Sequence, residues 1–147
     1  MKKVSAIIVN WNGKDVLSVC LKSLLEQDYE NLEIIVVDNG SEDGSQTLVK
    51  EEFSSVKLIE NEKNLGFGSA VNRGLDKAKG DYFIFLNNDL ALKTDCICQL
   101  ASLLGSDSSI GAAIPKILYY SQHGQESSNE TARINSYGVL VNYTGIA

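Results

Sequence analysis

Strand-like and helix-like patterns alternate four times along this chain of 147 residues. Short apolar runs of the kind that form buried strands lie at residues 4–9, 33–38, 56–60 and 82–86. Helical patterns follow them at residues 16–25, about 43–53, 69–79 and about 94–104. This alternation predicts an α/β fold whose mostly parallel, doubly wound sheet carries helices on both faces.

The first helical stretch has a clear amphipathic pattern. Its predicted core face consists of Val16, Leu17, Cys20, Leu21, Leu24 and Leu25. Polar side chains occupy the opposite side, so we expect this helix to pack on one face of the sheet.

The chain is less regular after the fourth helical stretch. Residues 110–117 predict a last clear strand, which Pro115 interrupts. Residues 121–131 are almost entirely polar and aperiodic, so we expect a mobile loop there. Residues 134–143 regain enough alternation for one more strand. Because no clear terminal element follows, we expect the domain to be truncated at its C-terminus.

Charge and composition argue against two classes of partner. The formal net charge is −6 and no block of Lys or Arg occurs, so we expect no nucleic-acid binding, which depends on clustered cations. No segment approaches the roughly 20 apolar residues of a membrane span. The first apolar run, residues 4–9, stops at Asn10, which favours a buried strand over a signal peptide and predicts a cytoplasmic protein.

Three polar clusters fall directly after predicted strands. They occupy residues 10–12 (Asn-Trp-Asn), 38–41 (Asp-Asn-Gly-Ser) and 87–89 (Asn-Asn-Asp). The carboxyl ends of parallel strands meet at one edge of a sheet, where open α/β folds bind their ligands. We therefore expect a site that combines an aromatic ring, amides and the carboxylates of Asp38 and Asp89. Such a site suits a ligand with a flat ring, hydroxyl groups and phosphate.

Other site motifs are absent or incomplete. The chain has no Gly-x-x-x-x-Gly-Lys phosphate loop and no Gly-x-Ser-x-Gly nucleophile elbow. Gly66 begins a dinucleotide-like fingerprint, but Val71 occupies its third glycine position. A receiver-like signalling domain with Asp38 as phospho-acceptor would need acidic residues after the first strand, where this chain has Asn10 and Asn12.

Four motifs, in their order and spacing, resemble those of family 2 glycosyltransferases. They occupy residues 4–13, 33–45, 64–74 and 80–89, and the resemblance covers roughly residues 3–120. The wording Asn-Arg-Gly (72–74) and Leu-Asn-Asn-Asp (86–89) is similar to the rhamnosyltransferase-like branch. The resemblance implies a GT-A fold in which residues 1–120 form the α/β domain that binds a nucleotide-sugar donor. Residues 121–147 would then be a polar loop and the incomplete start of an acceptor-side region.

The resemblance also implies the site residues. The donor-binding set is Asn10, Trp11, Asn12, Asp38, Asn39, Asn64, Gly66, Asn72, Asn87 and Asn88. Among them, Asp38 is expected to hydrogen-bond the nucleobase, and the loop containing Asn64 to close over the nucleoside. Asp89 and Asn87 stand where the family carries its Asp-x-Asp triplet, so they are the expected ligands of a Mg²⁺ or Mn²⁺ ion. Asn87 replaces a carboxylate there, which leaves Asp89 as the principal charge.

By the same resemblance, we expect metal-dependent, inverting transfer of a hexosyl or rhamnosyl group. The donor would be a UDP- or dTDP-linked sugar, and the acceptor a saccharide or a lipid-linked molecule of cell-wall or polysaccharide synthesis. Peripheral association with the inner face of the plasma membrane fits such an acceptor. The downstream carboxylates Asp107, Glu126 and Glu130 have no recognisable general-base context, so the catalytic base is unassigned and we expect donor binding rather than transfer from this chain alone. The alternative is a non-catalytic nucleotide or nucleotide-sugar binding module.

Overall fold

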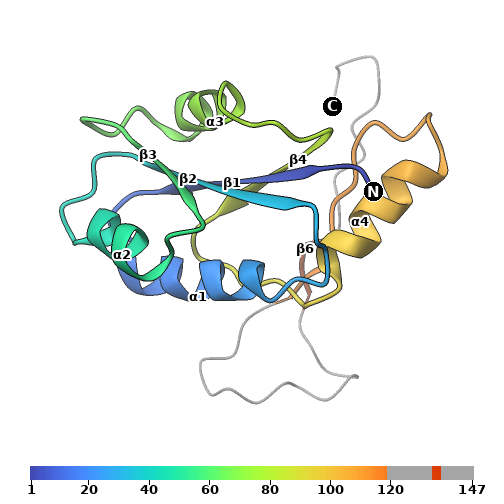
Figure 1. Ribbon diagram of the computed structural model, residues 1–147, viewed down its shortest axis with the longest axis horizontal. Coiled ribbons are helices and arrows are strands. Elements are labelled where there is room, and N and C mark those ends of the chain that lie inside the picture. The colour runs from blue at the N-terminus through green and yellow to red at the C-terminus, as the bar shows by residue number, and fades with distance from the viewer. Residues whose placement is uncertain (119–133, 137–147) are drawn as a thin grey trace. The chain divides into compact units, whose positions relative to one another are not determined.

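The computed structural model describes residues 1–118 and 134–136, and Figure 1 shows its ribbon. The chain divides into two compact units, residues 1–101 and 102–147. The first unit contains β1 (Val4–Asn10), α1 (Lys14–Leu25), β2 (Leu32–Asp38), α2 (Ser45–Glu52), β3 (Lys57–Glu60), α3 (Phe67–Leu75) and β4 (Tyr82–Asn87). Helix α4 (Cys96–Ser106) crosses the boundary, and β5 (Ile117–Leu118) and β6 (Ile134–Ser136) belong to the second unit.

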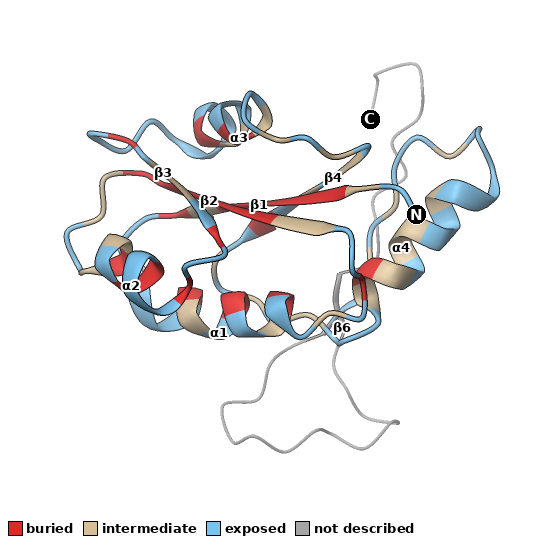
Figure 2. Ribbon diagram, in the orientation of Figure 1, coloured by how far each residue is buried: buried red, intermediate tan, exposed pale blue. Residues whose placement is uncertain are grey.

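The first unit is built on a four-stranded sheet in the order β3-β2-β1-β4. All three strand pairs in it are parallel. The central strands β1 and β2 are buried along most of their length (Figure 2). Helices α1 and α2 cover one face of the sheet and α3 covers the other (Figure 1). The doubly wound α/β fold predicted from the sequence is therefore confirmed.

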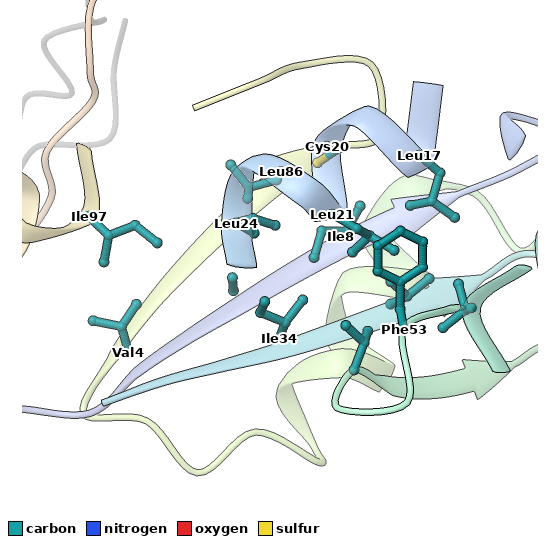
Figure 3. Packing of buried hydrophobic residues seen from close by; sticks show 14 of the residues in the cluster. Val4, Ile8, Leu17, Cys20, Leu21, Leu24, Ile34, Phe53, Leu86 and Ile97 are labelled. Atoms are coloured by element: carbon teal, nitrogen blue, oxygen red, sulfur yellow. The ribbon is translucent and has the colours of Figure 1, made fainter. Parts of the chain in front are cut away.

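The larger core lies between the sheet and helices α1 and α2 (Figure 3). Helix α1 buries Leu17, Cys20, Leu21 and Leu24, whose i, i+3, i+4 and i+7 spacing forms one stripe. The predicted core face is too wide at both edges, because Val16 remains 44% exposed and Leu25 49% exposed. Only the stripe that faces the sheet can be removed from water.

Helix α3 approaches the opposite face of the sheet closely. Ala70 of this helix packs in one cluster with Ile7, Ile35 and Val37 of the sheet. A Cβ atom added at Gly74 would fall 2.5 Å from Ile7 Cγ2, well inside van der Waals contact. The glycine within this helical pattern therefore allows the helix to lie against the strands.

Two predicted segments differ in the structure. Residues 110–117 do not form a continuous strand; only Ile117 and Leu118 pair, antiparallel with β6. Pro115 has no N–H group to donate to a strand ladder, which explains the interruption. Helix α3 ends at Leu75 instead of continuing to residue 79. The predicted loop at residues 121–131 and most of the predicted strand at 134–143 lie outside the described residues. None of the described helices has the length and apolar character that crossing a membrane requires.

Candidate functional site

The carboxyl ends of the four parallel strands lie along one edge of the first unit. In the register of the sheet, Asn10 at the end of β1 is opposite Asp38 of β2, and Val9 is opposite Asn87 of β4. Asp38 is in turn opposite Glu60 of β3. The structure thus brings the three predicted polar clusters to one edge, together with the end of β3.

Asp38 is fully buried at this edge and accepts four hydrogen bonds from its own chain. Its Oδ1 accepts from the Ser41 backbone N–H (2.8 Å) and from Gln46 Nε2 (2.8 Å). Its Oδ2 accepts from Asn10 Nδ2 (2.9 Å) and from the Ser41 hydroxyl (2.6 Å). Burial by itself would raise the pKa of Asp38, but these hydrogen bonds outweigh burial and lower the pKa below its ordinary value. Because an ionised carboxylate offers about four lone-pair positions, all of them are used here.

Asn10 connects Asp38 to the turn after β4. Its Nδ2 donates to Asp38, and its Oδ1 accepts from Asn88 Nδ2 at 2.7 Å. Asn10 is itself fully buried. One amide therefore ties the turn after β4 to the turn after β2.

The turn after β1 combines a fixed backbone with an exposed ring. Asn12 has a positive φ of 49°; its N–H donates to Ser41 Oγ (2.9 Å) and its Oδ1 accepts from the Glu42 N–H (2.8 Å). The neighbouring Trp11 is 56% exposed. An indole in this position is suited to stacking on a flat ligand while the turn beneath it stays in place.

A chain of three amides runs from the turn after β2 to the loop after β3. Asn64 Oδ1 accepts from the Gly66 backbone N–H (2.8 Å) and from Asn39 Nδ2 (3.3 Å). Asn39 Oδ1 accepts from Asn61 Nδ2 at 2.8 Å. Asn39 and Asn61 are both buried. These bonds hold the loop that contains Asn64 and Gly66 against the strand edge.

A hollow of about 350 Å³ lies at the turns after β2 and β3. Gly40 allows these turns to meet, because it has a φ of +76° and a Cβ added there would fall 2.9 Å from Lys63 Cα. The lining residues are Gly40, Ser41, Glu42, Gln46, Glu60, Asn61 and Glu62. The three glutamates give this hollow a negative charge, of which the Lys50–Glu60 ion pair (2.8 Å) offsets one unit.

The turn after β4 holds the predicted metal ligands. Asn87 and Asp89 are both exposed. Burial, together with the nearby charge of Asp89, raises the pKa of Cys20 to about 12, so this thiol is protonated at neutral pH. In residues 1–118, no three His, Cys, Asp or Glu side chains converge as a metal cage. One exposed carboxylate and one amide oxygen fit a hard cation that keeps several waters and shares the phosphates of its ligand.

Not every predicted residue joins these networks. Asn72 is exposed on α3, and its side chain makes no hydrogen bond within the described part of the chain. Conversely, sequence reasoning missed Gln46 and Asn61. Asn61 directly follows β3, so the rule that located Asn10 after β1 could have found it. Gln46 lies in the first turn of α2, where no sequence pattern distinguishes it.

Comparison with known proteins gives a consistent result. The family model described as "Glycosyl transferase family 2" matches residues 5–143. The glycosyltransferase GlyA of Streptococcus pneumoniae serotype 4 is 35% identical over 98 residues, which are 65% of this chain and 14% of GlyA.

Solved structures show the same fold. The mannosyltransferase PcManGT of Pyrobaculum calidifontis, in complex with GDP-Man and Mn²⁺, superposes with a TM-score of 0.66 at 25% identity over 80% of this chain and 34% of PcManGT. TarS 1-349 of S. aureus, in complex with UDP-GlcNAc, gives a TM-score of 0.67 at 22% identity over 81% of this chain and 38% of TarS. These neighbours confirm the predicted GT-A-like fold. The chain spans between 14% and 38% of the length of the proteins compared.

Proposed function

The chain belongs to glycosyl transferase family 2, and from this membership we propose that its strand edge binds the donor of the reaction, a nucleoside diphosphate sugar. The observation that carries the proposal is the convergence of Asn10, Asp38 and the turn at residues 87–89 on one edge of a parallel sheet. That edge is where open α/β sheets bind ligands. An exposed indole, buried amides and an exposed carboxylate offer separate contacts for a base, a ribose and a diphosphate.

The nucleoside is assigned to the part of the edge between Trp11 and the loop at residues 64–66. Trp11 supplies an exposed ring for stacking. Asp38 is proposed to hydrogen-bond the nucleobase in exchange for one of its present donors, and its four hydrogen bonds hold Asn10 and the turn after β2 in place. Asn39 holds the loop at residues 64–66 by donating hydrogen bonds to Asn64 Oδ1 and to the Gly66 carbonyl. Asn72, which is exposed on α3, is also proposed to contact the donor.

The diphosphate is assigned to the turn after β4, with Asp89 and Asn87 as the protein ligands of Mg²⁺ or Mn²⁺. When bound, a divalent cation stabilises the charge that develops on the departing diphosphate. Asn88 hydrogen-bonds Asn10 and so restrains the backbone that carries Asp89. The structure of PcManGT in complex with GDP-Man and Mn²⁺ supports the proposal of a divalent cation.

The transfer itself is proposed to invert the anomeric centre and to move a hexose or rhamnose from a UDP- or dTDP-linked donor. The proposed acceptor is a saccharide or a lipid-linked molecule, presented on the cytoplasmic side of the membrane during cell-wall or polysaccharide synthesis. Inversion requires one group that removes the acceptor proton. None of the described residues is assigned to that role.

Titration calorimetry tests the donor assignment. The ligands are UDP, dTDP, GDP and their sugar conjugates, each with and without Mn²⁺. We expect Mn²⁺-dependent binding of at least one of them, and a loss of about tenfold or more in Asp89→Ala, because this substitution removes the only carboxylate of the turn. Asp76→Ala is the matched control, since it removes an exposed carboxylate at the far end of α3.

Each result has a distinct meaning. Equal binding by Asp89→Ala and Asp76→Ala would contradict the metal assignment, and a failure of every nucleotide to bind would contradict the donor assignment. Addition of a lipid-linked acceptor extract then tests transfer through release of the nucleoside diphosphate. Donor binding without release in that mixture would favour the non-catalytic binding module.

A further inference from the structure

Residues 88–95 connect β4 to α4 and carry Asp89, the proposed metal ligand. The segment contains no helix or strand, and Asp89 is exposed in it. A ligand that binds an irregular segment ordinarily has to order it, and the conformational entropy lost in that ordering weakens binding. The affinity of this site therefore depends on whether the fold already holds residues 88–95 in place.

Helix α1 holds the C-terminal part of this segment through Ser23. The segment runs along α1, as the yellow trace in Figure 1 shows, and is hydrogen-bonded to it. Ser23 Oγ accepts from the Leu92 N–H at 3.1 Å and donates to the Cys20 carbonyl of its own helix at 2.8 Å. A hydroxyl has only one proton, so donation into the helix leaves Oγ as an acceptor for the Leu92 N–H. Both functions of this hydroxyl are used.

Gln27 adds a second connection, two residues after the end of α1. Its Nε2 donates to the carbonyls of Lys93 (2.8 Å) and Ser23 (3.0 Å). Its Oε1 accepts from the N–H of Ile97, a buried residue of α4, at 3.1 Å. The orientation of the amide is fixed, because both carbonyls can only accept and the N–H can only donate. Gln27 thus ties the segment to α1 and to the start of α4 at once.

The N-terminal part of the segment is tied to β1. Asn88 Nδ2 donates to Asn10 Oδ1 at 2.7 Å. Leu90 and Leu92 pack against the larger core, so the backbone follows the surface of that core between its hydrogen-bonded points. The main chain on both sides of Asp89 is therefore held by the fold itself.

We propose that Ser23 and Gln27 are positioning residues for the cation site at Asp89. They hold the backbone of residues 92 and 93, so that the segment presents this carboxylate without having to be ordered by the ligand. The inference rests on the proposed metal-assisted donor site, and it assigns to that site two residues that act through the main chain of the segment. Both are half-buried polar residues at the end of α1 that lie outside its buried stripe.

The test separates the effect of Mn²⁺ from the binding of the nucleotide. Calorimetry measures UDP affinity with and without Mn²⁺, and the ratio of the two affinities is the Mn²⁺ gain. In Ser23→Ala and in Gln27→Ala this gain should fall about fivefold or more, while the affinity without Mn²⁺ should stay within about twofold of the wild type. A loss of overall stability alone would not produce this split. If dTDP or GDP is the nucleotide that binds, it replaces UDP.

Two variants serve as controls. Ser23→Thr keeps the hydroxyl and should keep the Mn²⁺ gain of the wild type. Tyr29→Phe removes a side-chain hydrogen bond to the Lys2 carbonyl (2.6 Å), near the start of β1, and should also keep it. Hydrogen exchange measured by nuclear magnetic resonance gives a second readout: the Leu92 amide should be protected in the metal-free wild type and should exchange faster in Ser23→Ala.

The outcomes separate this inference from the metal assignment. If the wild type shows a Mn²⁺ gain that Ser23→Ala and Gln27→Ala retain, or that Ser23→Thr loses as fully as Ser23→Ala does, the positioning role is refuted while the metal assignment stands. An unprotected Leu92 amide in the metal-free wild type would also refute it, and this measurement needs no variant to fold. If the wild type binds UDP with no Mn²⁺ gain, the metal assignment of Asp89 fails and this inference fails with it.

Discussion

Replacement of Asp38 by Ala tests whether one buried carboxylate organises the strand edge. The substitution removes the acceptor of four hydrogen bonds. The Ser41 hydroxyl can rotate and the half-buried Gln46 can reach water. The buried Asn10 amide keeps only its bond to Ser41 Oγ (3.2 Å), and the N–H of the half-buried Ser41 loses its partner. A lost hydrogen bond of this kind costs about 1–3 kcal/mol, so we expect a loss of about 3 kcal/mol in the free energy of unfolding.

Urea unfolding followed by far-ultraviolet circular dichroism measures this loss. Asp43→Ala is the matched control, because Asp43 also accepts backbone hydrogen bonds, from Lys14 (2.8 Å) and Ser45 (3.0 Å), but is exposed. The Asp43 carboxylate and Lys14 are exposed and only Ser45 is buried, so removal of this carboxylate should cost less, about 1 kcal/mol. A loss in Asp38→Ala no larger than that in Asp43→Ala would refute the view that Asp38 holds the edge together.

Three further results are expected. Hydrogen bonds hold the pKa of Asp38 below its ordinary value, so the unfolded state binds this proton first as the pH falls. The stability that Asp38 contributes is therefore present above about pH 4 and is lost below it. In urea titrations from about pH 3 to 6, the free energy of unfolding should decline more steeply with falling pH for the wild type than for Asp38→Asn. Gly74→Ala should lower the free energy of unfolding by about 1–3 kcal/mol, because its Cβ would lie 2.5 Å from Ile7 Cγ2 of the sheet. Gly68→Ala is the control: a Cβ there meets open space, so it should raise the free energy of unfolding by up to about 1 kcal/mol. The thiol of Cys20 is buried and has a pKa of about 12, so we expect it to react with a disulfide reagent only as the protein unfolds. If Cys20 and the half-buried Cys98 were labelled equally fast in the folded protein, the burial of Cys20 would be contradicted.

The strands of the sheet could be predicted from the sequence because they are short apolar runs that end in polar residues. Strands β1, β2, β3 and β4 lie within a residue of the predicted ranges. The predictions were wrong where the burial or pairing of a residue depends on a neighbouring element that the hydrophobic pattern does not identify. Val16 and Leu25 fit a helical face, but their exposure depends on how wide a stripe of α1 the sheet covers. Residues 110–117 are apolar enough for a strand, yet a strand also needs N–H groups and a neighbour, and only Ile117 and Leu118 have one.

The position of the site at the strand edge could be predicted from the sequence, but the hydrogen bonds between its side chains could not. The rule that parallel strands present their carboxyl ends at one edge brings Asn10, Asp38 and Asn87 together without any knowledge of the side chains. The difference between Asp38, whose acceptors are all occupied, and Asn61, whose Oδ1 is unpaired among the described residues, depends on the direction of each hydrogen bond. Direction is a property of the folded turns, so no pattern of residue types could supply it.

The same directional argument explains why an amide and not an acid stands at the end of β1. Asp38 is ionised and can only accept, so its neighbour at 2.9 Å has to donate, and Asn10 does so through Nδ2. The other end of that amide is then an acceptor, which fixes Asn88 as a donor and ties the turn after β4 to the same carboxylate. An Asp at position 10 would place two carboxylates side by side in a buried position and would raise the pKa of one of them. The acidic pair that a receiver-like domain requires is thus incompatible with this network, in which Asp38 is an anchor for the strand edge and not a phosphoryl acceptor.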